Sequence, residues 1–398
     1  MKRIPWVVKF VAVQLAILLL VGEVGLRVLH SRSDTLRVLL FMPSITSEFD
    51  ELDTLPDLMS RTIIGYSPYE RHAGFLSNSR GFRTPEYSLE KEDGTRRVVI
   101  IGDSFAFSCA GIPFAEHWPQ LLEARLQDQR AETVEVLTLA APGVGPLFER
   151  RLWEIEGSRM EPDVLLLQLF VGNDFTDHYE ADSDEAWTAG LARRSYAVRL
   201  VRNGLRVLAA RKGSLHAESS STAEGESART GGVEMPGYRE EYLARPPFLS
   251  RERLMQVESQ RARLCEASQH AYFVEMLARL TDVVGDLHDQ VEAAGVEFRV
   301  VIIPDRFQVN PNERDEILAR LRKDGRLFDW EKPQRGIVEF CRHEGIPVLD
   351  LLAASREAAR TETLYDPGNT HWNLDGNAFA AREIAAWLGS FRANPEAP

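Results

Sequence analysis

From residue 96 onward, short apolar runs alternate with longer segments of helical periodicity, and this alternation constrains the fold more than any other feature of the chain. The apolar runs have the unbroken hydrophobicity of strands that are buried on both faces. They lie at 96–101, 134–139, 163–171, 296–303 and 346–351. The helical patterns lie at 116–129, 147–160, 251–294, 334–345 and 374–390. This alternation predicts an α/β fold, with a mainly parallel five-stranded sheet covered on both faces by helices.

The composition of the 398-residue chain excludes several classes of protein. With 44% hydrophobic and 27% charged residues, the chain is not disordered throughout, not collagen-like and not a protein of many membrane spans. Its formal net charge of −13 argues against a general nucleic-acid binder, which needs a basic face. Cys109, Cys265 and Cys341 are too few and too scattered for a disulfide framework or a zinc site, and at most one disulfide could form.

The N-terminus has the pattern of a secretion signal. Lys2 and Arg3 precede an apolar stretch at 6–29, which contains no good small-x-small cleavage site. Its uncharged core at 10–22 is short for a spanning helix, but the basic residues near its ends could reach the membrane interface. We expect residues 1–30 to form a retained single-pass signal anchor, with the rest of the chain outside the cytoplasm. A cleaved signal peptide and a buried N-terminal helix are the alternatives.

The rest of the chain divides into a lead-in and a domain. Residues 31–94 are irregular and polar and are predicted to be a stalk and lead-in to a domain at 95–398. An insertion at 176–250 interrupts the alternation. Within it, 191–212 has seven basic residues, no acid and an apolar face. That pattern suits a membrane-surface helix, a lid over the site, or a docked helix with a solvated basic face. Residues 213–236 are rich in small and polar residues and are expected to be flexible.

The strongest chemical signal is Gly102-Asp103-Ser104-Phe105, directly after the first predicted strand. A serine in this position lies at the carboxyl edge of the sheet, where the ligands of open α/β folds bind. If a helix begins near Ser104, its free amide groups and its dipole favour a developing negative charge. The plain alternative is a strand-to-helix turn in which Ser104 has only a capping role.

A serine needs a base to become a nucleophile, and the segment from Tyr365 to Asn373 supplies a candidate. This loop precedes the last predicted helix and holds Asp366 and His371 close together in sequence. His371 could accept the proton of Ser104 while a nearby carboxylate fixes its tautomer. A histidine with a surface or capping role is the alternative.

Two further loops follow predicted strands and could supply an oxyanion hole. Asn173 lies in Gly-Asn-Asp after the third predicted strand, and Gly143 follows the second strand with an accessible backbone N–H. Together with the N–H of Ser104, these groups would hold an oxyanion, with each donor worth about 3 kcal/mol. Both loops could also be turns without a chemical role.

Taken in order, these motifs resemble the SGNH family of GDSL-type serine esterases and acyl hydrolases. The matching residues are Gly-Asp-Ser-Phe at 102–105, Gly143, Gly-Asn-Asp at 172–174 and His371. The resemblance covers about residues 96–390 apart from the insertion. It implies a flavodoxin-like three-layer α/β/α fold. It also implies that Ser104 is the nucleophile and His371 the base, and that Gly143 and Asn173 are oxyanion donors.

The chain departs from this family at the group that orients the histidine. In much of the family an acid lies three residues before the histidine, and Gly368 holds that position here. In a membrane-associated subset similar to the alginate O-acetylation proteins, the acid lies two residues before it, and Asn369 holds that position here. An asparagine could orient His371 but could not stabilise the imidazolium by charge. We expect Asp366, the nearest acid, to orient His371, with Asn369 as the alternative.

The residues and the resemblance together predict an extracytoplasmic, membrane-anchored serine esterase that forms an acyl-enzyme on an ester, for which an acylated glycan is a candidate. If a sugar hydroxyl accepts the acyl group instead of water, the same site is an O-acyltransferase. With Asn369 at an acid position, an inactive module that binds a glycan or a partner protein is the third possibility.

Other chemistries find little support in the sequence. No cofactor or metal is predicted, because the chain has no G-x-x-x-x-G-K phosphate loop and because His117 and His178 follow no ligand spacing. Ser104 also lacks the G-x-S-x-G elbow of the α/β-hydrolases. Asp305, after the fourth predicted strand, could contact substrate, although a role in a turn is the simpler interpretation.

Overall fold

The computed structural model describes residues 14, 21–23, 25–26, 71–72, 74–176 and 232–390. Those from residue 71 onward belong to one compact unit, drawn from 68–178 and 228–398. Most of the predicted anchor at 1–30, and the whole of the predicted basic helix at 191–212, lie outside the described residues. Within the described part of the chain, no helix combines the length and the hydrophobicity that a membrane span needs.

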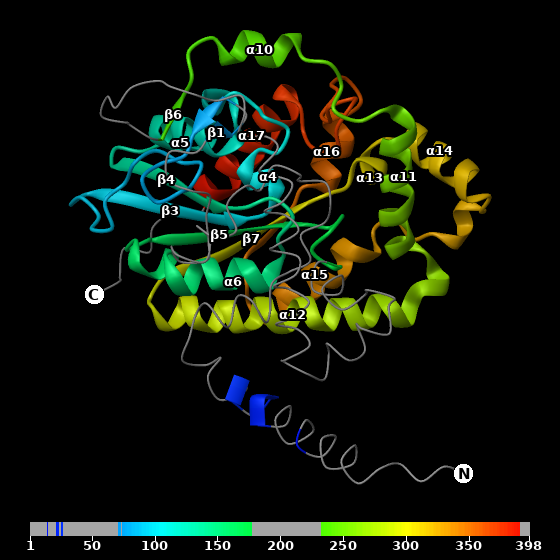
Figure 1. Cartoon of the computed structure of the whole chain (residues 1–398), viewed down its shortest axis with the longest axis horizontal. Helices are drawn as coiled ribbons and strands as arrows, with labels where there is room; N and C mark the ends of the chain where they lie inside the picture. The colour runs from blue at the N-terminus through cyan, green and yellow to red at the C-terminus, as the bar shows by residue number, and fades with distance from the viewer. Residues whose placement is uncertain are drawn as a thin grey trace. The chain divides into compact units, whose positions relative to one another are not determined.

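Five parallel strands form the central sheet, in the order β4-β3-β5-β7-β8 (Figure 1). Their bounds are Thr95–Gly102 (β3), Thr133–Ala140 (β4), Val164–Phe170 (β5), Glu297–Ile303 (β7) and Val348–Asp350 (β8). The predicted parallel five-stranded sheet is therefore confirmed. When only these five strands are numbered by their position along the chain, their order in the sheet is 2-1-3-4-5, which is the flavodoxin-like arrangement. The strand order reverses at β3, so a ligand crevice is expected at the carboxyl ends of β3 and β5.

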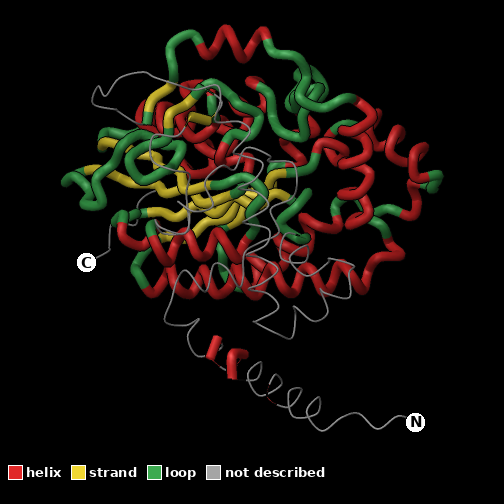
Figure 2. The backbone as a smooth tube through the Cα atoms, viewed as in Figure 1, coloured by secondary structure: helices red, strands yellow, loops and turns green. Residues whose placement is uncertain are grey.

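Helices cover both faces of the sheet, which appears in Figure 2 as yellow strands between red helices. One face carries α5 and α17, and the other carries α6, α12 and α15 (Figure 1). Their bounds are Trp118–Gln129 (α5), Pro146–Ile155 (α6), His270–Ala293 (α12), Lys332–His343 (α15) and Leu374–Ser390 (α17). Because both faces are covered, side chains such as Val99, Ile100 and Leu166 are fully buried. Burial of each contributes about 1.5–3 kcal/mol, which explains the unbroken apolar runs.

The helical pattern at 251–294 is not one helix, and that prediction was wrong. The chain forms α11 (Arg251–Arg261), two short 3-10 turns at 262–265 and 267–269, and then α12. Between the two turns, Glu266 has extended dihedral angles, and its backbone carbonyl accepts a hydrogen bond from Lys332 Nζ at 2.9 Å. A contact with the first residue of α15 thus overrides the local helical preference at the break.

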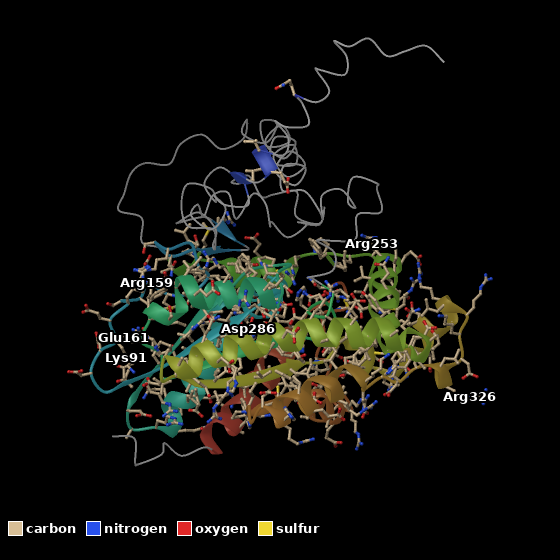
Figure 3. The ribbon with its side chains drawn as sticks, turned by 90° about the horizontal axis from the view of Figure 1, so that it is seen from below. Lys91, Arg159, Glu161, Arg253, Asp286 and Arg326 are labelled. Carbon is tan, nitrogen blue, oxygen red and sulfur yellow. The ribbon has the colours of Figure 1, made fainter. Side chains whose placement is uncertain are left out.

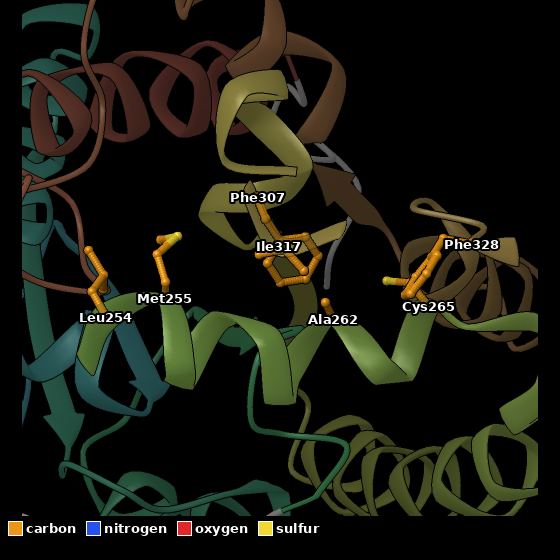
Figure 4. Close-up of a cluster of buried hydrophobic side chains, with 7 residues drawn as sticks. All are labelled: Leu254, Met255, Ala262, Cys265, Phe307, Ile317 and Phe328. Carbon is orange, nitrogen blue, oxygen red and sulfur yellow. The ribbon is translucent and has the colours of Figure 1, made fainter. Parts of the chain in front are cut away.

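A smaller apolar cluster fixes α11 beside the carboxyl edge of the sheet. It joins α11 to α13 (Arg306–Val309) and α14 (Pro311–Leu321), which follow β7. Its buried members are Leu254, Met255, Ala262, Cys265, Phe307, Ile317 and Phe328 (Figure 4). In Figure 4, Phe307 and Ile317 approach α11 from the opposite side of the cluster. The end of the predicted insertion is therefore anchored to the domain.

A three-stranded antiparallel sheet joins the lead-in to the end of the insertion. It consists of β1 (Arg71–His72), β2 (Phe75–Leu76) and β6 (Val233–Glu234), with β2 in the middle. We expected residues 213–236 to be flexible, but Val233 and Glu234 pair with β2, in which Phe75 is fully buried. Helix α10 (Tyr238–Ala244) follows, and a segment at 245–250 leads from it to α11.

The two edges of the central sheet carry different chemistry. At the amino edge, Lys91 Nζ lies 2.7 Å from Asp163, which also accepts the backbone N–H of Arg97 at 2.7 Å. Lys91, Arg159 and Glu161 lie together at this end of the domain in Figure 3. The carboxyl edge instead carries the loops that hold every residue for which we predicted a role in the site.

Candidate active site

Ser104 lies at the carboxyl end of β3, as the first residue of a short helix, α4 (Ser104–Phe107). Asp103 caps this helix by accepting the backbone N–H of Phe105 at 2.9 Å, so Asp103 rather than Ser104 has the capping role. Gln168, on β5, accepts the backbone N–H groups of Asp103 and Ala106, each at 3.2 Å. A Cβ at Gly102 would lie 2.5 Å from the Gln168 amide oxygen, so the turn requires glycine. These contacts fix the backbone that presents Ser104.

His371 lies in hydrogen-bonding contact with Ser104, although 267 residues separate them in sequence. Nε2 of His371 is 2.8 Å from Oγ of Ser104. Nδ1 of His371 is 2.7 Å from Oδ1 of Asn369. Because an amide oxygen only accepts, Nδ1 carries the proton and donates it to Asn369. The unprotonated Nε2 therefore faces the Ser104 hydroxyl, which is the arrangement that a general base needs.

Asp366 does not contact the imidazole. This geometry corrects our prediction that Asp366, and not Asn369, orients His371. The Asp366 carboxylate binds Arg245 Nη2 at 3.0 Å and accepts the backbone N–H of Gly368 at 2.8 Å. The backbone N–H of Asp366 donates to the carbonyl of His371 at 2.9 Å, which closes a narrow hairpin. In this hairpin the side chain of Asp366 is turned toward Arg245, while Asn369 reaches the ring.

The catalytic histidine candidate is held in an aromatic environment. The ring of Phe105 lies 4.7 Å from that of His371 and 5.0 Å from that of Trp372. Burial lowers the pKa of His371 to about 3, and the positive charge of Arg261 contributes in the same direction. The imidazole is therefore neutral near pH 7 and able to accept a proton.

The predicted oxyanion donors flank Ser104 in the sheet order. Gly143 follows β4, and Asn173 follows β5, the two strands on either side of β3. Gly143 has a φ of 64°, in the left-handed region that favours glycine. A side-chain hydrogen bond joins Asn173 to Asp103, where it opposes the effect of burial in raising the pKa of Asp103. Asn173 thus lies beside the serine turn, and the roles of Gly143 and Asn173 as donors remain predictions.

A buried arginine holds the loop that carries the histidine. Nη1 of Arg306 donates to the backbone carbonyl of Asp366 at 2.9 Å and to that of Asn369. Its Nε binds the Glu313 carboxylate at 2.7 Å, and the Arg306 side chain is only 5% exposed. Because the guanidinium is planar and offers several donors, one side chain can fix two carbonyls and an ion pair together.

Two buried carboxyl groups meet next to the loop of Asn173. Within the described residues, Oε2 of Glu258 and Oδ2 of Asp305 have no hydrogen-bond donor directed at them. The two carboxyl groups can form a hydrogen bond with one another only when one of them is protonated. Burial, followed by the charge of Asp305, raises the pKa of Glu258 well above its ordinary value. Asp305 also caps α13 and lies 2.6 Å from the position of a Cβ at Gly172.

Several residues that shape the site were not predicted from the sequence. Gln168 is the only polar residue in its apolar strand, which was a usable signal. Arg306 follows Asp305 directly, but nothing local indicates its reach to the histidine loop. His117 and Trp118 bind the carbonyl of Phe105 at 3.1 and 3.0 Å, so His117 supports the serine turn.

His178 lies outside the described residues. Cys109, Cys265 and Cys341 are all free.

Residues 266–396 match the family model described as SGNH hydrolase-like domain, acetyltransferase AlgX. The resemblance to the SGNH family is confirmed. The SGNH-like match begins at the break before α12 and includes the loop with Asn369 and His371, whereas Ser104 precedes it. No curated protein matches the chain.

Solved structures similar to this SGNH-like chain are distant from it in sequence. A catalytic mutant of an acetylxylan esterase from Geobacillus stearothermophilus is 11% identical, with a TM-score of 0.40, over 76% of this chain and 100% of that one. The lipase/acylhydrolase from Enterococcus faecalis is 10% identical, with a TM-score of 0.36, over 75% of this chain and 100% of that one.

Proposed function

We propose that the chain is a serine acyl hydrolase in which Ser104 attacks an ester carbonyl. The observation that carries this proposal is the contact between Ser104 Oγ and His371 Nε2 at 2.8 Å, with Nδ1 held by Asn369 at 2.7 Å. As Oγ bonds to the carbonyl carbon, its proton passes to Nε2, and the carbonyl oxygen becomes an oxyanion. The backbone N–H groups of Ser104 and Gly143 and the amide of Asn173 would stabilise that charge.

The intermediate then collapses to an acyl-enzyme. The bond between the carbonyl carbon and the alcohol oxygen breaks, and the imidazolium gives its proton to the leaving alkoxide. In the second half, His371 takes a proton from water, whose oxygen attacks the acyl carbon. The bond from that carbon to Ser104 Oγ then breaks, the imidazolium returns its proton to Oγ, and a free carboxylic acid leaves. The proposed substrate is an acylated glycan, which the similarity to the alginate O-acetylation proteins supports.

The proposal is tested with p-nitrophenyl acetate and a serine-directed fluorophosphonate. The wild-type protein should hydrolyse the ester and be labelled at Ser104, and Ser104→Ala should lose both properties without unfolding. Ser158→Ala removes an exposed serine from the same domain and is the matched control, with no expected effect. Folded wild-type protein that is neither labelled nor active would instead favour the inactive binding module.

The alternative candidate is an O-acyltransferase, which the family model favours by its description. The first half of the reaction is the same, and a sugar hydroxyl replaces water as the acceptor. Product analysis in the presence of a glycan acceptor separates the two activities. An acylated sugar supports the transferase, whereas free acid alone supports the hydrolase.

We further propose that the chain is anchored by residues 1–30 and that its catalytic domain lies outside the cytoplasm. The basic start and the apolar stretch of the N-terminus support this location. Membrane fractionation after an alkaline wash, with a topology reporter fused to the C-terminus, tests it. Recovery in the washed soluble fraction would contradict retention of the anchor.

A further inference from the structure

Phe248 is the most exposed large apolar side chain among the described residues, with 73% of its surface accessible. None of the other exposed large apolar side chains among the described residues is aromatic, and isolated apolar side chains are common on protein surfaces. Phe248 differs from them in its position, because it lies in the segment at 245–250 that packs against the histidine loop.

Three contacts hold this segment to the loop. The backbone N–H of Leu249 donates to the carbonyl of Gly368 at 2.7 Å. A Cβ at Gly368 would lie 2.4 Å from Pro247 and 3.2 Å from the backbone nitrogen of Phe248, so the two backbones are in close contact. Arg245 binds the carboxylate of Asp366 at 3.0 Å.

The segment is also stiff, and it presents its aromatic ring outward. Pro246 and Pro247 fix their own φ angles and restrict the residue before each of them. The guanidinium of Arg245 lies 4.2 Å from the centre of the Tyr242 ring. Leu249 packs against the apolar cluster between α11 and α14. Because both neighbours of Phe248 are anchored, the backbone that carries the exposed ring is held in place before any ligand binds.

The ring lies near the proposed chemistry without belonging to it. Gly368 lies three positions before His371, a stretch that spans at most about 11 Å. Phe248 is therefore within the reach of a chain of sugar rings that has one ring at Ser104.

We propose that Phe248 is a stacking platform for a pyranose ring of a saccharide substrate, beside the sugar whose ester reacts at Ser104. An aromatic face carries partial negative charge, and the C–H groups on one face of a pyranose carry partial positive charge, so the two faces attract one another. Stacking removes apolar surface from water on both partners and leaves the sugar hydroxyls solvated. This inference rests on the proposed function and adds to it the residue that would bind the sugar next to the reacting one.

Binding is measured separately from turnover, by calorimetry on the full chain carrying Ser104→Ala, with acetylated xylo-oligosaccharides as the probe. The double variant Ser104→Ala/Phe248→Ala should have a Kd about tenfold higher than Ser104→Ala alone. The double variant Ser104→Ala/Phe248→Tyr keeps an aromatic ring and should have the same Kd as Ser104→Ala alone. Leu243→Ala removes another exposed side chain, 56% accessible on α10, and should leave the Kd unchanged. The inference is overturned by a Kd that Phe248→Ala does not change, or by the absence of any binding.

Turnover distinguishes failure of this inference from failure of the proposed function. In the protein with Ser104 intact, Phe248→Ala should leave kcat/KM for p-nitrophenyl acetate within about twofold of wild type and lower kcat/KM for the oligosaccharide about tenfold. An equal loss on both esters would mean that Phe248 acts on the histidine loop and not on the sugar. Wild-type protein without activity on either ester would contradict the proposed function, while the binding measurement would still decide the role of Phe248.

Discussion

Asn369 Oδ1 lies 2.7 Å from Nδ1 of His371, the position that a carboxylate occupies in Ser-His-Asp triads. The amide fixes the tautomer and the ring orientation, but it carries no charge that would stabilise the imidazolium. An aspartate at this position would both orient the ring and compensate the charge of the imidazolium. Asn369 therefore supplies only the orientation.

The first prediction compares the two candidates for the orienting group. Asn369→Ala removes the partner of Nδ1 and should lower kcat about 10- to 100-fold, since a hydrogen bond to a charged group is worth about 1.5–3 kcal/mol. Asp366→Asn keeps the shape of its side chain and should lower kcat much less. Steady-state kinetics on p-nitrophenyl acetate measure both. A larger loss in Asp366→Asn than in Asn369→Ala would restore Asp366 as the orienting residue.

The second prediction concerns pH. Since burial and Arg261 hold the pKa of His371 at about 3, the base stays neutral as the pH falls below 6. In a plot of kcat/KM against pH, the midpoint of the fall on the acid side should accordingly lie well below the ordinary histidine pKa of about 6.5. Arg261→Gln removes the positive charge and should move this midpoint upward, whereas Arg263→Gln, an exposed change two residues away, should not. A wild-type midpoint near pH 6.5 would show that His371 is not shielded in this way.

The third prediction tests Arg306 as a positioning residue for the histidine loop. Arg306→Lys keeps the charge beside Glu313 but cannot also bind the carbonyls of Asp366 and Asn369. We expect kcat to fall about tenfold with KM nearly unchanged, because the base is displaced rather than the substrate site. Arg251→Lys changes the outer partner of Glu313 and is the control. Equal kcat values in Arg306→Lys and wild type would show that Arg306 does not position the histidine loop.

The fourth prediction concerns the proton between Glu258 and Asp305. Because the pKa of Glu258 is raised in the folded protein, the folded state binds this proton more tightly than the unfolded state does. Its contribution to the free energy of unfolding is full below the unfolded pKa of about 4.3 and is lost as the pH rises toward the folded pKa. Glu258→Gln cannot ionise and should flatten this decline in denaturant titrations from pH 4 to 9. The exposed change Glu240→Gln should leave the decline as it is. An unchanged slope in Glu258→Gln would contradict a shared proton.

The sequence predicted the parts of the site that follow from strand ends. Ser104 and Asn173 come directly after buried strands, and the parallel sheet brings such positions to one edge. The group that orients His371 could not be decided in this way, because it depends on which side chain a hairpin of a few residues turns toward the ring. The contacts of Arg306 and Gln168 join segments that are distant in sequence, and periodicity carries no information about them. The break before α12 was missed for the same reason, because Lys332 binds the Glu266 carbonyl from another element.

The central claim is that Ser104 becomes acylated with His371 as its base, and mass spectrometry of the acyl-enzyme tests it most directly. Wild-type protein is mixed with p-nitrophenyl acetate, quenched in acid within milliseconds to seconds, and digested. The account predicts one acetyl group on the peptide that contains Ser104, a far slower appearance of it in His371→Ala, and none on that peptide in Ser104→Ala. Turnover of the ester without acetyl on Ser104, or acetylation at the same rate in His371→Ala, would contradict the account.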